Sequence, residues 1–293
     1  MPFEFPMRGE IHKLNAEIRA EQPGEFISLS DGVTHFQIDG PGDGPLVVLV
    51  HGFSVPYFIW DPTFEALVEA GYRVLRYDLF GRGYSDRPFV RNDLELFDRQ
   101  LVDLLDALNL PSVDALLGLS MGGVITANFT ASHPERVRRI GLFDPAGFPA
   151  EYPFYIRLLL LPILGEIIFG SIGEKLFQKL AGNDFYDPRH IDVFFDQYRI
   201  QMQYKGFRRS LLSTMRSGIL ETGLPIYQAV GGLEIPAILV WGEHDHTVPF
   251  ENSQSLIKAV PQAEFYPIAN SGHIPHYENA VEVNPLLLEF LKK

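Results

Sequence analysis

Short runs of apolar residues recur along this chain, and each one stops at a glycine or a polar turn before an amphipathic stretch follows. Continuous apolar runs of this kind are typical of parallel strands that are covered on both faces. Residues 46–50 form such a run, and further strands are predicted at 113–117, 237–241, 73–77, 137–143 and 263–268. Because helical patterns separate them, the sequence predicts an α/β fold with a doubly wound, mostly parallel sheet. A ligand should then bind at the carboxyl ends of the strands.

Turn and capping signals locate further elements. Residues 25–39 alternate around Ser30-Asp31-Gly32, which predicts a hairpin of two half-exposed strands. Asp61 and Pro62 predict a helix over 61–70, with Asp61 as its N-cap and Pro62 at its first position. Asn92-Asp93 is expected to cap a helix whose apolar residues recur at helical spacing, and a final helix is predicted over 281–292.

The alternation of strands and helices fails between residues 148 and 232, which predicts a helical cap inserted after the strand that ends at Phe143. This segment is nearly neutral, with nine basic and eight acidic residues, in a chain of net charge −13. Residues 152–170 form the longest apolar run, but Arg157 and Glu166 interrupt it. A membrane-spanning helix needs about 20 apolar residues without charge. We therefore expect a helix of the cap that is buried or faces substrate.

Composition narrows the classes of protein. A chain of 293 residues can form one large domain with an insertion, and the absence of cysteine excludes disulfides and thiolate chemistry. The net charge of −13 disfavours nucleic acid and anionic membranes as partners. Residues 1–22 carry charges throughout and show no signal-peptide pattern. We expect a cytoplasmic protein without a transmembrane segment, and the oligomeric state is left open.

The most informative stretch is Leu116-Leu117-Gly118-Leu119-Ser120-Met121-Gly122-Gly123. An apolar strand ends here in a tight turn, and a helical segment follows at once. Such a strand–turn–helix forces the serine into a strained backbone conformation and exposes its hydroxyl at the edge of the sheet. Small residues at 118 and 122 allow the strand and the helix to approach closely. Ser120 is therefore a candidate nucleophile.

Five motifs, in this order along the chain, give it a resemblance to the α/β-hydrolase superfamily, in particular to its serine esterase and lipase-like branch with a helical cap. They are His51-Gly52-Phe53, the segment from Asp78 to Ser85 (DLFGRGYS), the turn around Ser120, Gly242-Glu243-His244-Asp245, and Ser271-Gly272-His273. The resemblance implies a catalytic domain of residues 1–147 and 233–293, with the cap at 148–232.

A serine hydroxyl needs a base, and that base needs a third group to orient it. Histidine suits the first role because its pKa lies near neutral pH. The residues alone leave both His273 and His276 as candidates for the base, and the resemblance favours His273. For the acid, Asp245 follows a predicted strand, and the order Ser, Asp, His is the one that this fold uses. Asp144, just after another strand, is the alternative.

Two backbone N–H groups are candidates for stabilising an oxyanion, those of Phe53 and Met121. His51 is expected to be structural, and Asp78, Arg82 and Asp86 are expected to brace their loop. The neighbouring residues 243–246 contain two histidines and two acids, but adjacent residues in a loop rarely converge on one ion. The glycines at 81 and 83 match no phosphate-binding pattern. No metal and no cofactor are predicted.

These residues favour a serine hydrolase that cleaves a carboxylic ester through an acyl-enzyme intermediate. The near-neutral apolar cap favours an uncharged, hydrophobic substrate, although Arg208 and Arg209 leave room for a carboxylate. The alternatives are a carbon–carbon bond hydrolase of aromatic ring-fission products, a lactonase or perhydrolase, and a non-catalytic ligand receptor. Relatives of the carbon–carbon type usually carry tryptophan directly after the catalytic histidine, where this chain has Ile274.

Overall fold

The computed structural model describes residues 5–150, 153–171 and 182–293, and within them it contains an eight-stranded sheet in the order β1-β2-β4-β3-β5-β6-β7-β8. The strands are β1 (Glu25–Leu29), β2 (Gly32–Asp39), β3 (Leu46–Val50), β4 (Arg73–Tyr77), β5 (Ala115–Leu119), β6 (Ile140–Phe143), β7 (Ala237–Gly242) and β8 (Ala263–Ile268). The β1–β2 hairpin joins the sheet antiparallel through β2 and β4, and all other pairs are parallel. The predicted mostly parallel sheet is confirmed.

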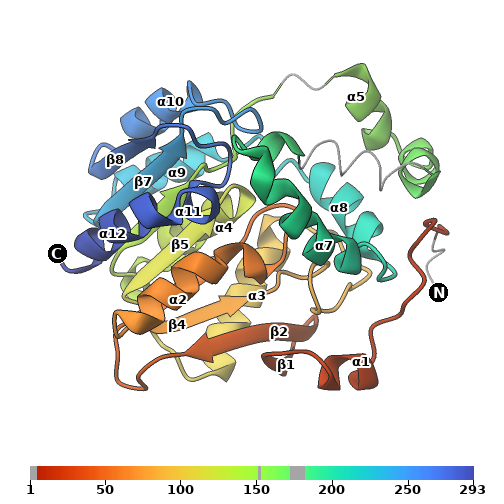
Figure 1. Cartoon of the computed structure of the whole chain (residues 1–293), viewed down its shortest axis with the longest axis horizontal. Coiled ribbons are helices and arrows are strands. Elements are labelled where there is room, and N and C mark those ends of the chain that lie inside the picture. The colour runs from red at the N-terminus through yellow and green to blue at the C-terminus, as the bar shows by residue number, and fades with distance from the viewer. Residues whose placement is uncertain (1–4, 151–152, 172–181) are drawn as a thin grey trace.

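Helices cover both faces of this sheet. They are α2 (Asp61–Glu69), α3 (Leu94–Ala107), α4 (Met121–Ser132), α9 (Leu224–Gly231), α10 (Asn252–Ala259), α11 (Pro275–Glu278) and α12 (Ala280–Leu291). The short α1 (Ala16–Ala20) lies outside these two layers, beside the β1–β2 hairpin (Figure 1). Helices α2, α11 and α12 contact one another on the face toward the viewer in Figure 1, and α3, α4, α9 and α10 form the layer behind it. The two-sided cover explains why the central strands are apolar without alternation.

Strand β3 shows how the two cores divide. Val47 and Leu49 pack with Trp60 in the core on one face, whereas Val48 and Val50 pack in the other core with the leucines of α3. All four valine and leucine side chains are completely buried. The strand is therefore held on both sides, and its carboxyl end, where the chemistry was predicted, has a fixed position.

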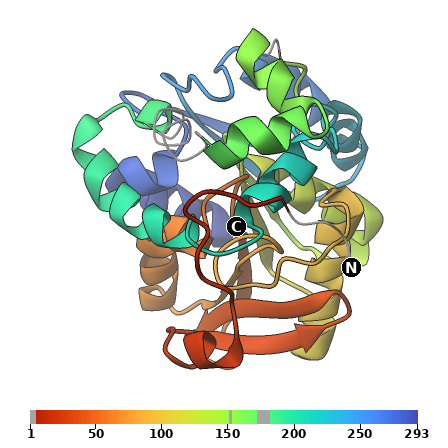
Figure 2. The ribbon, with the colours of Figure 1, turned by 90° about the vertical axis from the view of Figure 1, so that its right-hand side faces the viewer.

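The inserted helical region lies between β6 and β7. It contains α5 (Phe154–Leu160), a second helical stretch at Leu164–Ser171, η3 (Gly182–Asp184), η4 (Pro188–His190), α7 (Ile191–Gln201) and α8 (Phe207–Met215). Figures 1 and 2 show α5, α7 and α8 gathered beyond one end of the sheet. The predicted cap, 148–232, also includes residues 151–152 and 172–181, which lie outside the described part of the chain, and its boundaries stay a prediction.

The apolar run of the cap was expected to be buried or to face substrate, and only part of it is buried. Ile156 and Leu159 are buried, but Phe154 is 75%, Ile163 62% and Ile167 54% exposed. The reason is that the run forms two short helices bent by 115°, each of which turns only one side inward. Within the described residues no single helix is long and apolar enough to cross a membrane, and only this bent pair reaches the required length and composition.

Two predicted helix starts had different outcomes. Of the predicted cap Asn92-Asp93, Asp93 is the N-cap of α3, because its side chain accepts the N–H of Leu96 at 3.1 Å. Asp61 is not an N-cap, because the 3₁₀ helix η1 (Tyr57–Trp60) runs directly into α2 and leaves Asp61 with helical dihedrals of −46° and −53°. Its carboxylate instead pairs with Arg76 of β4.

The predicted strand 137–143 begins only at Ile140, since the 3₁₀ turn η2 (Pro134–Arg136) precedes it.

Candidate active site

The turn between β5 and α4 holds Ser120 in a strained conformation, with φ 53° and ψ −119°. A non-glycine residue rarely adopts a positive φ, so the surrounding structure must enforce it. Two hydrogen bonds do so, because the N–H of Ser120 donates to Phe143 of β6 at 2.9 Å and its carbonyl accepts the N–H of Ala146 at 3.0 Å. The strained conformation that the sequence predicted is present.

Close approach of strand and helix explains the glycines around this serine. A Cβ at Gly118 would lie 2.3 Å from the carbonyl oxygen of Gly122 and 2.4 Å from the hydroxyl of Thr126. A side chain at Gly122 would meet the carbonyl of Val50 at 2.3 Å. Both distances are far below van der Waals contact, so α4 can pack against β5 and β3 only with glycine at these positions.

The loop after β3 lies directly against the serine, since a Cβ built on Gly52 would come within 3.3 Å of the Ser120 Cβ. His51 fixes this loop: its Nδ1–H donates to the carbonyl of Gly52 and its Nε2 accepts the N–H of Leu79, both at 2.9 Å. Burial lowers the pKa of His51 to about 4, so the ring stays neutral. Its structural role orients the peptide that carries the N–H of Phe53.

Met121 is the first residue of α4, so its backbone N–H has no acceptor inside that helix. It follows Ser120 directly, as Phe53 follows Gly52 on the neighbouring loop. The positive end of the α4 dipole lies at the same place. The two predicted N–H donors therefore come from the two backbone segments that adjoin the serine.

His273 and Asp245 form a buried pair at the ends of β8 and β7. His273 Nδ1 lies 2.7 Å from Asp245 Oδ2, and the two residues expose only 5% and 4% of their surface. Asp245 Oδ1 accepts the N–H groups of Thr247 and Val248, each at 2.8 Å. Burial alone would lower the pKa of His273, but the charge and hydrogen bond of Asp245, with the charge of Asp184, raise it overall.

The alternative base, His276, and the alternative acid, Asp144, have other surroundings. His276 is completely buried, with its ring 4.1 Å from that of Trp60, and burial lowers its pKa to about 3. Asp144 accepts the N–H of Gly242 at 2.9 Å through its Oδ1. The structure thus pairs His273, rather than His276, with a carboxylate, and that carboxylate is Asp245.

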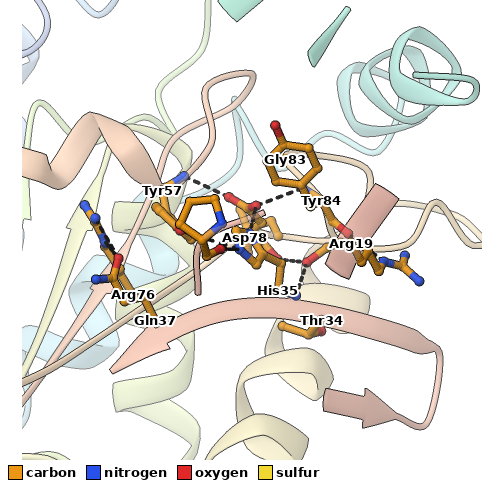
Figure 3. A network of polar contacts seen from close by, with 12 residues as sticks. Arg19, Thr34, His35, Gln37, Tyr57, Arg76, Asp78, Gly83 and Tyr84 are labelled. Carbon is orange, nitrogen blue, oxygen red and sulfur yellow. Dashed lines mark hydrogen bonds and ion pairs between the residues drawn. The ribbon is translucent and has the colours of Figure 1, made fainter. Parts of the chain in front are cut away.

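Asp78 stands at the centre of a buried polar network, which Figure 3 shows. Its carboxylate accepts His35 Nδ1 at 2.7 Å and the N–H groups of Tyr57 and Tyr84 at 2.9 Å each. Asp78 therefore braces its own loop and also the start of η1 at Tyr57, which closely follows Phe53 in the chain. Nothing in the sequence singled out His35, which lies 43 positions away from Asp78.

Arg82 and Asp86 brace their surroundings, as expected. Arg82 is completely buried and donates to the carbonyl of Phe53 at 2.7 Å and to the hydroxyl of Thr214 in α8 at 2.9 Å. Asp86 accepts the N–H of Val33 at 2.7 Å. Arg82 thus ties the loop beside Ser120 to the inserted helices.

Residues of the inserted region hold the loop that carries His273. The N–H of His273 donates to the carbonyl of Asp184 at 2.8 Å, and the Asp184 carboxylate accepts the hydroxyl of Thr247 at 2.5 Å. Burial raises the pKa of Asp184 to about 6, although the charge of His273 lowers it. Sequence reasoning missed this contact, because it joins segments about 90 residues apart.

Glu278 of α11 completes this attachment. Its Oε2 accepts the N–H of Gly272 at 2.9 Å and that of Tyr186 at 3.2 Å, and its Oε1 accepts the N–H of Asp187. One carboxylate therefore joins the turn before His273 to the inserted segment after Asp184. No motif in the sequence marked Glu278.

Within the described residues, Asp144, Asp245 and His273 form one group whose ligand atoms lie within 4.8 Å of one another. Two atoms that bind the same zinc ion at about 2.0–2.2 Å are separated by well over 3 Å. The 2.7 Å between His273 and Asp245 is a hydrogen-bond distance instead. The geometry of this pair therefore fits proton chemistry better than ion binding.

Residues 47–286 match the family model described as "Alpha/beta hydrolase family". The chain belongs to this family. The match includes all the residues discussed above from Gly52 to His276, and it covers most of the chain.

Among curated relatives, this hydrolase is 27% identical to a carboxylesterase of Bacillus subtilis, over 92% of this chain and 88% of the relative. It is 26% identical to a 2-hydroxy-6-oxo-6-phenylhexa-2,4-dienoate hydrolase of Comamonas testosteroni, over 90% and 93%. The solved enol-lactonase of Burkholderia xenovorans superposes with a TM-score of 0.79 at 22% identity, over 92% of this chain and all of that one. The last likeness shows the shared fold.

Two arginines that the sequence left open as carboxylate ligands have other partners in this hydrolase. Arg208 donates to the carbonyl of Phe169 at 3.0 Å and lies 3.6 Å from Glu10. Arg209 donates to the carbonyls of Arg87 and Pro88 at 2.7 and 3.0 Å. Both guanidinium groups are occupied in fixing the cap to the N-terminal segment and to the loop before α3.

Proposed function

We propose that this hydrolase cleaves carboxylic esters of uncharged, hydrophobic substrates through an acyl-enzyme on Ser120. The observation that carries the proposal is the strained Ser120 at the end of β5, with a hydrogen-bonded His273–Asp245 pair at the same edge of the sheet. These are the three groups that nucleophilic acyl transfer requires.

In this mechanism His273 Nε2 accepts the proton of Ser120 as the hydroxyl attacks the ester carbonyl. Asp245 holds the ring through Nδ1 and stabilises the imidazolium that forms. The N–H groups of Phe53 and Met121 stabilise the oxyanion, and each donor of this kind is worth about 3 to 4 kcal/mol in the transition state. The imidazolium then protonates the leaving alcohol, and water activated by His273 releases the acid.

Aromatic contacts between body and cap support a hydrophobic substrate. The ring of Phe58, in the body, lies 5.8 Å from that of Phe194 in α7, which also stacks with Tyr198 at 5.9 Å. Leu211 of α8 belongs to the same core as Phe143 beside the serine. Phe194, Tyr198 and Leu211 are buried, so a substrate that enters between body and cap would meet apolar side chains. Such an environment favours substrates that lose little hydration on entry.

A series of p-nitrophenyl esters tests the proposal. We expect kcat/KM to rise from acetate to butyrate and octanoate, because each buried methylene contributes up to about 0.8 kcal/mol, and to level off near laurate. A steady decline from acetate onward would show that the cap does not form an acyl site. Absence of hydrolysis across the whole series would contradict ester chemistry.

Carbon–carbon bond hydrolysis is the second candidate, since the dienoate hydrolase of Comamonas testosteroni is about as similar to this chain as the carboxylesterase. Its dienoate substrate carries a carboxylate, whereas Arg208 and Arg209 are engaged elsewhere. The aromatic ring-fission dienoate should therefore react far more slowly than butyrate esters. The reverse order would make carbon–carbon cleavage the activity, and a lactone and a peracid assay test the remaining acyl-transfer alternatives.

A further inference from the structure

Asp144 is a buried carboxyl group whose hydrogen bonding is incomplete as an anion. It follows β6 with φ 41°, a left-handed conformation that Asp and Asn tolerate better than other side chains. Its Oδ1 accepts the N–H of Gly242, whereas its Oδ2 is buried and meets no donor within the described structure. A buried anionic oxygen without a donor is unfavourable. As a carboxylic acid, the same group would be a donor itself.

Three titratable groups from three elements face Asp144: Asp245 after β7, His273 after β8, and Asp184 of η3. Ligand atoms of Asp144, Asp245 and His273 lie within 4.8 Å of one another. Burial first, and then the charge of Asp245, raise the pKa of Asp144 well above its ordinary value. Of two carboxyl groups this close, one has a raised pKa, and the group that is not hydrogen-bonded to His273 is the one that keeps the proton.

We propose that Asp144 is a positioning residue, a neutral carboxylic acid whose O–H donates to the carboxylate of Asp245 and holds it toward His273. This inference rests on the proposed function, in which Asp245 and His273 act together. The proton stays on Asp144 throughout turnover. Its hydrogen bond fixes the rotation of the Asp245 carboxylate and spreads the negative charge that acts on His273.

A matched pair of variants separates this role from two others, an ionised carboxylate and a side chain that only fills space. Asp144→Asn keeps the tolerated backbone, an acceptor for Gly242 and a donor for Asp245. We expect kcat/KM to stay within about two-fold and the midpoint of its pH profile to stay in place, because no charge is lost. Asp144→Ala removes the donor. We expect about a ten-fold lower kcat at unchanged KM, and a midpoint about half a unit higher, because the Asp245 charge becomes more concentrated.

A direct measurement does not depend on activity or on folding of the alanine variant. The infrared difference spectrum of wild type minus Asp144→Asn at neutral pH should show the C=O stretch of a protonated carboxylic acid. If a carboxylate band appears instead, or if Asp144→Asn moves the pH midpoint downward, Asp144 is ionised and the proposal is overturned. An unmoved midpoint in a folded Asp144→Ala variant would likewise reduce Asp144 to a packing role.

Ester hydrolysis and the protonation of Asp144 are tested separately. A protonated Asp144 in an enzyme that hydrolyses no ester contradicts the proposed function and leaves the assignment of this proton intact. Active ester hydrolysis with an ionised Asp144 contradicts only the inference drawn here.

Discussion

The nucleophile and the base are held in different ways. Ser120 takes all its described backbone contacts from the body, through Phe143, Gly123 and Ala146. The loop of His273 is instead attached to the inserted region, through Asp184 directly and through Glu278. Disturbance of the cap should therefore act on the base and its pH dependence, whereas the geometry of the serine depends on packing within the body.

The largest expected effect follows from separating the base from its acid. Asp245→Asn should lower kcat/KM about 10⁴-fold, because the ring loses its orienting acceptor and its stabilising charge. The residual pH profile should shift to lower pH, since Asp245 raises the pKa of His273. Steady-state kinetics across pH measures both. If Asp245→Asn is nearly silent and Asp144→Asn is crippling, the two carboxyl groups must exchange roles.

On the nucleophile side, Gly118→Val tests whether packing in the body fixes the turn. The new Cβ would overlap the carbonyl of Gly122 and the hydroxyl of Thr126, so stability should fall by on the order of 3 kcal/mol, together with activity. Gly42→Ala is the matched control, because nothing lies within 4 Å of its Cβ position. Urea unfolding compares them, and equal stability of the two variants would refute the steric account.

On the base side, Glu278→Gln should separate activity from stability. The amide turns a donor toward at least one of the N–H groups of Gly272, Tyr186 and Asp187, which displaces the loop of His273. We expect kcat to fall about 10- to 100-fold, as small misplacements of a catalytic group do. Glu282→Gln, on the exposed side of α12, should match wild type. A fall in melting temperature without a fall in kcat would contradict the proposed positioning.

The smallest expected effect concerns the charge of Asp184. His273 must be neutral to accept a proton, and its pKa is raised, so kcat/KM should rise with pH through a midpoint above the ordinary value of about 6.5. Asp184 is largely ionised at that midpoint because its own pKa is about 6. Asp184→Asn removes a charge that raises the pKa of His273, so the midpoint should move down by about 0.5 unit. The exposed Asp192→Asn should leave it in place, and an upward shift in Asp184→Asn would show that the sign is wrong.

This difference between the nucleophile and the base also explains which parts of the fold and of the site the sequence could predict. The strands at 46–50 and 73–77, the turn at Ser120 and its glycines follow from short apolar runs and local stereochemistry, which a sequence displays directly. The Asp184 and Glu278 contacts depend on how the cap folds back, and no local pattern encodes them. Asp61 failed as an N-cap for a local reason, because η1 directly precedes it and supplies the first turn.

The central claim is that Ser120 is the nucleophile, and covalent labelling tests it most directly. A fluorophosphonate should add once, on the peptide that contains Ser120, and mass spectrometry should find no adduct in Ser120→Ala. That variant should keep the wild-type melting temperature within a few degrees while losing about 10⁴-fold or more in kcat. Labelling of a different serine, or ester hydrolysis at the wild-type rate by Ser120→Ala, would contradict the account.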